Sequence, residues 1–219
     1  MLKTADLFCP EHTIARDYLF RFEYPWQALP GLRETIVTLG STLGDNYVRT
    51  SDQVWIHATA TVAPTASITG PCIIGPGSQV RHCAFIRGSV LVGEGCVVGN
   101  SVELKNVILF DKVEVPHFNY AGDSILGYKS HLGAGAVTSN IKSDRTPVVI
   151  RCGEEAIATG MRKIGAMLGD FAEVGCNSVL NPGTVIGPHT TVYPLSCVRG
   201  TVPGNSIYKT GGVIVPREG

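Results

Sequence analysis

The sequence has no net charge, no paired cysteine motif and no long apolar run. Its 18 lysine and arginine residues balance 18 aspartates and glutamates, so no global field attracts nucleic acid or an anionic membrane. No apolar stretch approaches a membrane span, and the N-terminus, MLKTADLFCPEH, lacks the apolar core of a signal peptide. These absences indicate a cytoplasmic protein without nucleic-acid or membrane partners, in which any phosphate is bound by a few placed cations.

The seven cysteines are an odd number and include no CxxC pair. This usage argues against a disulfide framework and against a structural zinc site, and no bound metal is expected. We interpret most of the cysteines as small buried residues in a reducing compartment. The 26 glycines and 13 prolines are spread along the chain, which is typical of a fold with many tight corners.

Aliphatic residues recur at every sixth position, in two registers. The first register is Ile56, Val62, Ile68, Ile74, Val80, Ile86, Val92, Val98 and Leu104, and the second is Leu168, Val174, Leu180, Ile186, Val192 and Val198. A six-residue period fits neither a helix of 3.6 residues per turn nor a simple alternating strand. It fits a short strand and a tight corner, repeated three times per coil, which predicts an all-β fold, a parallel β-helix of hexapeptide repeats.

The period is absent from residues 1–50 and interrupted twice later. Residues 13–22 and 30–39 are predicted to form short helices, as a helical cap over the open N-terminal end of a β-helix domain spanning 51–219. Docking of this cap to a separate enzyme is an alternative. Between Leu104 and Leu126 we expect an insertion, and between Lys142 and Ile164 a projecting hairpin or irregular strands. Loops that project from a rigid scaffold often carry function.

The first interruption and its flanks carry a specific series of polar residues: Arg87, VGNSVELK at 98–105, His117, Tyr120, GD at 122–123 and GAGAVTSN at 133–140. This series resembles the acetyltransferase domain of bacterial bifunctional glucosamine-1-phosphate acetyltransferase/N-acetylglucosamine-1-phosphate uridyltransferases. GMRKIGAMLGD at 160–170 is similar to archaeal sugar-1-phosphate nucleotidylyltransferase/acetyltransferases. The resemblance covers residues 54–210. It implies a left-handed helix, a homotrimer with sites at subunit interfaces, and acetyl-CoA as acyl donor.

The expected chemistry needs a base, because an amine attacks a thioester only after losing its extra proton. Histidine suits this role near neutral pH, and His117 is our candidate. The resemblance implies that Glu103 accepts a hydrogen bond from the other ring nitrogen of His117. Preorganised donors stabilise the charge that develops on the thioester oxygen. Asn140 or a backbone N–H near Ala134 is expected to supply one.

The resemblance also assigns substrate-binding positions. Arg87 and Lys105 match positions that bind a sugar phosphate, as bidentate and point-charge partners, and Tyr120 matches a sugar contact. Two departures stand out, because His131 replaces an asparagine that contacts the sugar, and a second phosphate-binding lysine falls on Thr146. Lys142 or Arg145 is a possible substitute for that lysine. Pantetheine is expected beside Ala134 and Cys176, with Arg199 and Lys209 as weaker candidates for the phosphates of coenzyme A.

The predicted function is therefore N-acetylation of a hexosamine 1-phosphate, with glucosamine 1-phosphate favoured. One alternative is an acyltransferase for another amino sugar or a nucleotide sugar. Another is a non-catalytic scaffold that pairs with a separate nucleotidyltransferase. The LxAGxGTRM segment of the bifunctional relatives has no counterpart in this sequence, so we expect no uridylyltransferase activity.

Overall fold

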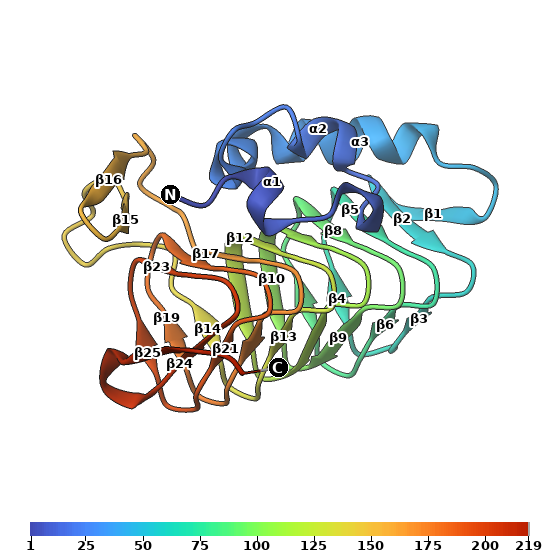
Figure 1. The fold of residues 1–219 in the computed structure, drawn as a ribbon. Helices are drawn as coiled ribbons and strands as arrows, with labels where there is room; N and C mark the ends of the chain where they lie inside the picture. Colours follow the sequence, from blue (N-terminus) through green and yellow to red (C-terminus); the bar gives the residue numbers. More distant parts are fainter. Residues whose placement is uncertain (219) are drawn as a thin grey trace.

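The computed structural model describes residues 1–218 as parallel strands stacked into successive coils (Figure 1). The fold is a left-handed parallel β-helix, which confirms the architecture predicted from the six-residue period. Each coil has three faces joined by three corners. No helix within residues 1–218 is long and apolar enough to cross a membrane.

Each face is a ladder of short strands. Face 1 contains β2 (Val54–His57), β5 (Cys72–Ile74), β8 (Val90–Val92), the second halves of β10 (Glu103–Leu109) and β12 (Tyr120–Leu126), β17 (Ala166–Leu168), β20 (Thr184–Ile186) and β23 (Thr201–Val202). Face 2 contains β3 (Thr61–Val62), β6 (Gln79–Val80), β9 (Val97–Asn100), β11 (Glu114–His117), β13 (His131–Leu132), β18 (Glu173–Val174), β21 (Thr191–Val192) and β24 (Ser206–Tyr208). Face 3 contains β4 (Ser67–Ile68), β7 (Phe85–Ile86), the first halves of β10 and β12, β14 (Val137–Thr138), β19 (Val179–Leu180) and β22 (Cys197–Val198).

The two ends of the β-helix depart from parallel pairing. At the N-terminal end, β1 (Tyr47–Ser51) runs antiparallel to β2. At the C-terminal end, η3 (Thr210–Gly212) precedes β25 (Ile214–Pro216), which runs antiparallel to β24. We call the corner that follows face 2 corner 2/3, and the corner that follows face 3 corner 3/1.

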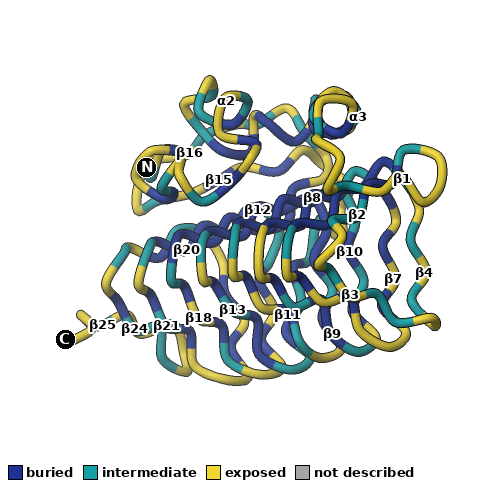
Figure 2. Tube along the Cα trace, turned by 90° about the vertical axis from the view of Figure 1, so that its right-hand side faces the viewer, coloured by how far each residue is buried: buried dark blue, intermediate teal, exposed yellow. Residues whose placement is uncertain are grey.

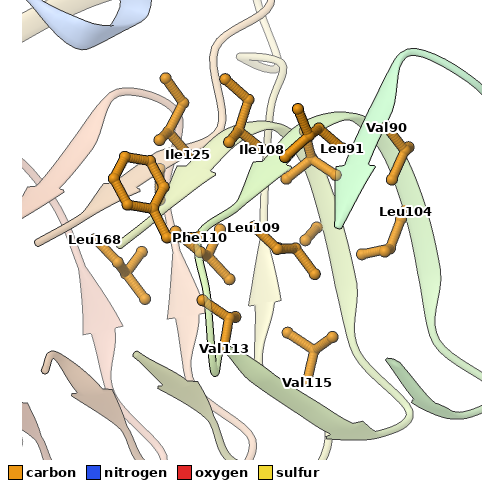
Figure 3. Close-up of a cluster of buried hydrophobic side chains, with 14 of the residues drawn as sticks. Val90, Leu91, Leu104, Ile108, Leu109, Phe110, Val113, Val115, Ile125 and Leu168 are labelled. Atoms are coloured by element: carbon orange, nitrogen blue, oxygen red, sulfur yellow. The ribbon is translucent and has the colours of Figure 1, made fainter. Parts of the chain in front are cut away.

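The periodic aliphatic residues fill the interior of the coils. Both predicted registers point inward and are buried, apart from the first three residues of the first register, which are partly buried. Figure 3 shows Leu109 and Leu168 on the inner side of face 1, whereas Ile108 and Ile125 lie on its outer side. The stacked coils therefore share one continuous apolar core, as the repeat predicted.

Face 1 is apolar on its outer side as well. Because side chains alternate along a strand, the middle residues of its strands point outward, and all of them are buried: Trp55, Ile73, Leu91, Ile108, Ile125, Met167 and Val185. They are covered mainly by the N-terminal segment, which contains α1 (Thr4–Leu7), η1 (Pro10–His12), α2 (Arg16–Leu19), η2 (Pro25–Gly31) and α3 (Leu32–Thr42).

The predicted position of this segment at the open end of the helix is wrong. The segment lies along face 1, with α3 and η2 over β5, β8, β10 and β12 (Figures 1 and 2). Its apolar side chains, such as Trp26, Leu32 and Ile36, belong to the same core cluster as face 1. An apolar outer face has to be covered, and that requirement sets the position of the segment.

The first interruption of the repeat is a deletion, not the predicted insertion. Glu103 pairs with Phe85, eighteen residues earlier, whereas Tyr120 pairs with Glu103, only seventeen residues earlier. Corner 3/1 shrinks to two residues here, and β10 and β12 run continuously from face 3 to face 1. Asn106 and Asp123 turn the backbone with φ of 51° and 50°, a left-handed conformation that asparagine and aspartate tolerate best after glycine.

The second interruption is the expected hairpin. β15 (Val149–Cys152) pairs antiparallel with β16 (Glu155–Ala158) and projects from corner 3/1. An isolated bridge between Ile141 and Lys163 closes the neck of this insertion. Residues on its two sides therefore meet near the Asn140 position of the coil.

Candidate functional site

Corner 2/3 aligns His117 with both residues predicted to line the pantetheine path. The N–H of Gly135 donates to the His117 carbonyl at 3.0 Å, and the N–H of Asn177 donates to the Ala134 carbonyl at 2.8 Å. Asn177 follows Cys176 directly, so consecutive coils place His117, Ala134 and Cys176 along one edge of the helix. The His117 side chain is exposed at this edge, where a ligand can reach it.

Face 3 lies between this edge and corner 3/1. Glu103 and Tyr120 are register partners on adjacent coils and point outward from it. Face 3 strands are short, and at about 3.3 Å per residue the face is on the order of 10 Å wide. That width suits a single sugar ring.

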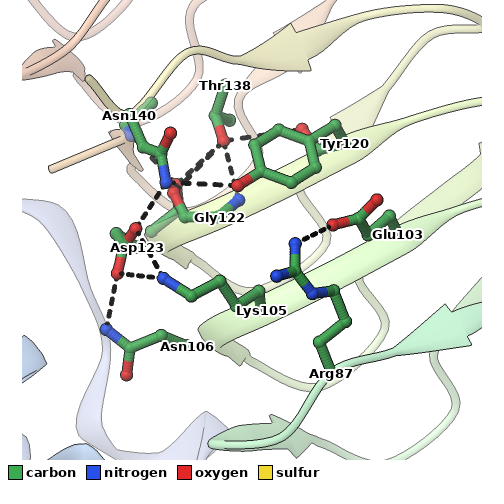
Figure 4. A network of polar contacts seen from close by, with 11 residues as sticks. Arg87, Glu103, Lys105, Asn106, Tyr120, Gly122, Asp123, Thr138 and Asn140 are labelled. Carbon is green, nitrogen blue, oxygen red and sulfur yellow. Dashed lines mark hydrogen bonds and ion pairs between the residues drawn. The ribbon is translucent and has the colours of Figure 1, made fainter. Parts of the chain in front are cut away.

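Corner 3/1 holds a polar network around the buried carboxylate of Asp123 (Figure 4). Asn106 Nδ2 donates to Asp123 Oδ1 at 2.8 Å, Lys105 Nζ lies 3.3 Å from Oδ2, and Asn140 Nδ2 also donates to Oδ2. Three donors compensate the burial of this charge. The network therefore fixes Lys105 and Asn140, two predicted site residues, relative to each other.

Tyr120 joins this network to face 3. Its hydroxyl accepts a hydrogen bond from Asn140 Nδ2 at 3.1 Å. Partial burial raises the pKa of Tyr120, and the nearby negative charge of Asp123 raises it further. The phenol thus stays neutral at physiological pH and keeps a proton to donate. The ring lies over Gly122, where a Cβ atom would meet the hydroxyl oxygen.

Arg87 and Glu103 form an ion pair on the same surface. Arg87 Nη1 lies 2.6 Å from Glu103 Oε1, and this hydrogen bond raises the pKa of the exposed guanidinium. Within residues 1–218, the His117 ring makes no hydrogen bond to Glu103. The expected Glu103–His117 contact stays a prediction, and the carboxylate is held by Arg87 in this structure.

A pocket of about 550 Å³ opens beside the network, and we call it the Arg145 pocket. Its lining is Leu29, Pro30, Asn106, Ile141, Arg145, Met161, Arg162 and Lys163. Three cations and no carboxylate line it, and Asn106 connects it to Asp123. Among the two proposed substitutes for the missing lysine, only Arg145 faces this pocket.

Arg162 and Lys163 are absent from the residues predicted by sequence. They lie far from Asn140 in the chain, and the bridge from Ile141 to Lys163 brings them back beside it. An ungapped comparison with the motif of the resembling family cannot find these two residues. Removing the hairpin from the alignment would have placed GMRK directly after the coil that ends at Asn140.

The remaining predicted residues separate into other positions. His131 lies on face 2, with Nδ1 3.2 Å from Glu114 Oε2, and lines a different pocket with Lys112 and Lys129. Lys209 directly follows β24. The carbonyl of Tyr208, the last residue of β24, accepts a hydrogen bond from the N–H of Tyr193 in the preceding coil.

Lys142 and Arg199 lie together on the other side of the insertion, away from Lys105. The seven cysteines are free thiols, but only Cys72 and Cys96 are buried, so the interpretation of most cysteines as buried residues is wrong. Residues 1–218 contain no group of three or more histidine, cysteine, aspartate or glutamate side chains placed to hold a metal ion.

Comparison with known proteins gives one family match. The GMPPB C-terminal domain family matches residues 68–156. A "Bifunctional protein GlmU" of Methanococcus maripaludis (strain S2) is 29% identical over 199 residues, which are 89% of this chain and 48% of that protein. A bifunctional sugar-1-phosphate nucleotidylyltransferase/acetyltransferase of Sulfurisphaera tokodaii is 29% identical over 126 residues, 58% of this chain and 31% of that protein.

This chain resembles the acetyltransferase region of these bifunctional proteins. It spans between about a third and a half of their length. Among solved structures, a perosamine N-acetyltransferase from Caulobacter crescentus with CoA and GDP-perosamine is 18% identical, covering 74% of this chain and 56% of that chain with a TM-score of 0.39. A likeness of this size carries no functional inference.

Proposed function

We propose that this protein is an N-acetyltransferase that transfers the acetyl group of acetyl-CoA to the amine of a hexosamine 1-phosphate. The observation that carries the proposal is the arrangement around face 3. A solvent-exposed histidine lies on one edge of this face, and a cluster of cationic side chains lies on the other. The sequence resemblance supports the same reaction class, with glucosamine 1-phosphate as the favoured acceptor.

His117 is proposed as the base at corner 2/3. It receives the proton that the ammonium of the acceptor must lose, and the free amine then attacks the thioester carbonyl. The C–S bond breaks as the amide forms, and the second amine proton passes to the leaving thiolate, which departs as CoA. Bound acetyl-CoA supplies the acetyl group. The small residues Ala134 and Cys176 leave room for a narrow chain along the same edge, and Lys209 is the proposed cation at its end.

Arg87 is proposed to exchange partners when the acceptor binds. Its guanidinium pairs with Glu103 through a single contact in this structure, and a phosphate offers a bidentate partner with more charge. Moving Arg87 to the phosphate releases Glu103, which can then orient the His117 ring. Substrate binding would thus assemble the pair that the resemblance implies.

The acceptor phosphate is proposed to lie at corner 3/1, between Lys105 and the Arg145 pocket. Arg145, Arg162 and Lys163 provide the positive charge that a lysine at Thr146 would otherwise supply. Tyr120 contacts the sugar ring through its neutral hydroxyl. Asn140 is proposed to donate a hydrogen bond to the reacting carbonyl oxygen. To do so, its side-chain amide must turn away from Asp123.

A second candidate is acetylation of a nucleotide-linked amino sugar. The Arg145 pocket favours it, because its volume of about 550 Å³ and three cations exceed the needs of one phosphate. A panel of acceptors, with CoA release as the readout, separates the two. Faster release with glucosamine 1-phosphate than with nucleotide sugars supports the first candidate, and the reverse order supports the second.

The reaction is tested directly by exchanging His117 for alanine. We expect CoA release to fall about 10²- to 10⁴-fold, the usual contribution of a general base, with an unchanged circular dichroism spectrum. His57→Ala is the matched control, because His57 lies in β2, away from face 3. Full activity of His117→Ala would remove this residue from the mechanism.

Assembly is proposed to complete the site. Phe118 and Leu195 are 63% and 76% exposed beside His117 and Cys176, as expected for an edge that meets another subunit. We propose a homotrimer in the cytoplasm with sites at subunit interfaces, and a molar mass from light scattering near three times 23.3 kDa is the expected result.

A further inference from the structure

A second cationic pocket lies on the opposite side of the hairpin insertion, and we call it the Arg151 pocket. It has a volume of about 240 Å³ and is lined in part by Lys142, Arg151, Arg199 and Asn181. These side chains come from four segments: the loop after Asn140, strand β15, and two successive turns of corner 3/1. Separate segments that converge on one small pocket are typical of a binding site.

The hairpin is packed against the β-helix at this point. Gly200 has a φ of +72°, and a Cβ atom there would lie 3.2 Å from the Arg151 carbonyl oxygen. Gly183, one coil earlier, lies even closer to the insertion, because a Cβ atom there would be 2.6 Å from Val148 Cγ1. These close approaches hold the backbone of Arg151 beside Arg199. The fold therefore brings both side chains to the same pocket.

Little negative charge compensates these cations. Lys142 pairs with the exposed Asp144 at 3.3 Å, whereas Arg151 and Arg199 form no ion pair within residues 1–218. Asn181 donates to the Val198 carbonyl at 2.9 Å, so its amide nitrogen is already engaged. Two guanidinium groups at one pocket that no carboxylate lines favour a bound anion.

The pocket belongs to a larger concentration of positive charge. Eight of the 18 lysine and arginine residues lie at corner 3/1 or in the insertion: Arg87, Lys105, Lys142, Arg145, Arg151, Arg162, Lys163 and Arg199. In a chain of zero net charge, this clustering creates a local positive field that attracts anionic ligands. The Arg145 pocket and the Arg151 pocket lie on either side of the hairpin neck.

We propose that the Arg151 pocket binds a phosphate group of one of the two substrates, with Arg151 and Arg199 as its main ligands. This inference rests on the proposed function and deepens it. A volume of about 240 Å³ suits a phosphate or diphosphate and is small for a whole nucleotide sugar. The acyl donor is the favoured source, because the acceptor phosphate already has cations beside Asn106. A coenzyme whose pantetheine chain follows corner 2/3 must then cross face 3 to bring a phosphate to this pocket.

Calorimetric titration of Arg151→Gln and Arg199→Gln tests the proposal. The probes are CoA, 3′-dephospho-CoA and glucosamine 1-phosphate, each added to the full-length protein. We expect each substitution to weaken CoA binding about tenfold, as loss of one charge-assisted contact does. Both side chains are exposed, so the thermal unfolding midpoint should not move. Arg49→Gln, on β1, is the matched control.

The probes distinguish the sources of the phosphate. Weaker CoA binding with unchanged 3′-dephospho-CoA binding assigns the pocket to the 3′-phosphate, and equal weakening of both assigns it to the diphosphate. Weaker binding of glucosamine 1-phosphate alone would support the phosphate site and assign it to the acceptor. The proposal would be overturned if both variants bound all three probes with unchanged affinity. It would also be overturned if the wild-type protein bound no CoA and the variants bound glucosamine 1-phosphate with unchanged affinity.

Failure of the pocket and failure of the proposed function are separable. If the variants bind CoA weakly but no amino sugar is acetylated by the wild-type protein, the phosphate site stands and the acetyltransferase proposal fails. If glucosamine 1-phosphate is acetylated and both variants bind all three probes with unchanged affinity, the acetyltransferase proposal stands and the phosphate site fails.

Discussion

Face 1 and face 3 are built from the same repeat, but their outer sides differ in chemistry. Face 1 carries Ile73, Leu91 and Ile108 outward, all fully buried. Face 3 carries Glu103 and Tyr120 outward, both partly exposed and held in polar contacts. The inward residues of the repeat build the scaffold, and the outward residues decide whether a face packs against another part of the chain or stays open to solvent.

The largest expected effect concerns the covered face. Ile108→Ala removes a fully buried side chain between face 1 and the N-terminal segment, and should lower the free energy of unfolding by about 2–5 kcal/mol. Glu173→Ala, at an outward position of face 2, should change it by less than about 0.5 kcal/mol. Urea unfolding measures both. Equal effects would mean that face 1 is not covered in solution.

A smaller effect is expected on the proposed ligand-binding side, face 3. Arg87→Ala should raise KM for glucosamine 1-phosphate about 10- to 100-fold, as expected for a lost charge-assisted pair with phosphate. Stability should not change, because the pair with Glu103 is partly exposed. Arg33→Ala, on α3, provides the control. An unchanged KM in Arg87→Ala would place the phosphate elsewhere.

The smallest effect concerns the attachment of the N-terminal segment. Asp170 accepts the N–H groups of Cys9 and Tyr128 at 2.8 Å each, and burial raises its pKa. The native state then binds the proton more tightly than the unfolded chain does. Stability therefore falls as pH rises from the ordinary aspartate value, about 3.9, to the raised native value.

Asp170→Asn should remove part of this pH dependence. Asp111, which is also buried enough to have a raised pKa, should retain the remainder. Unfolding free energies measured from pH 3.5 to 6.5 give the two slopes. A slope in the variant as steep as in the wild-type protein would show that Asp170 does not titrate in this way.

The sequence predicted the interior better than the exterior. Inward residues repeat every six positions, so their pattern could be recognised locally. The outward apolar residues of face 1 repeat only once per coil, at Trp55, Ile73, Leu91, Ile108 and Ile125. That longer period was present in the sequence and would have placed the N-terminal segment along face 1.

The positions of the candidate residues were predictable where they follow the coil and unpredictable where tertiary contacts decide. His117, Ala134 and Cys176 share an edge because equivalent positions of successive coils stack. Lys163 reaches the Arg145 pocket only through closure of the hairpin neck. The partner of Glu103 is set by the reach of the Arg87 side chain, which no spacing specifies.

A crystal structure with CoA and N-acetylglucosamine 1-phosphate would test the central claim most directly. The account predicts the acetamido group of the product within about 3.5 Å of the His117 ring, with its phosphate against Arg87 and Lys105. The pantetheine chain should pass Ala134 and Cys176. A product bound on face 2 beside His131, with His117 free of both ligands, would contradict it.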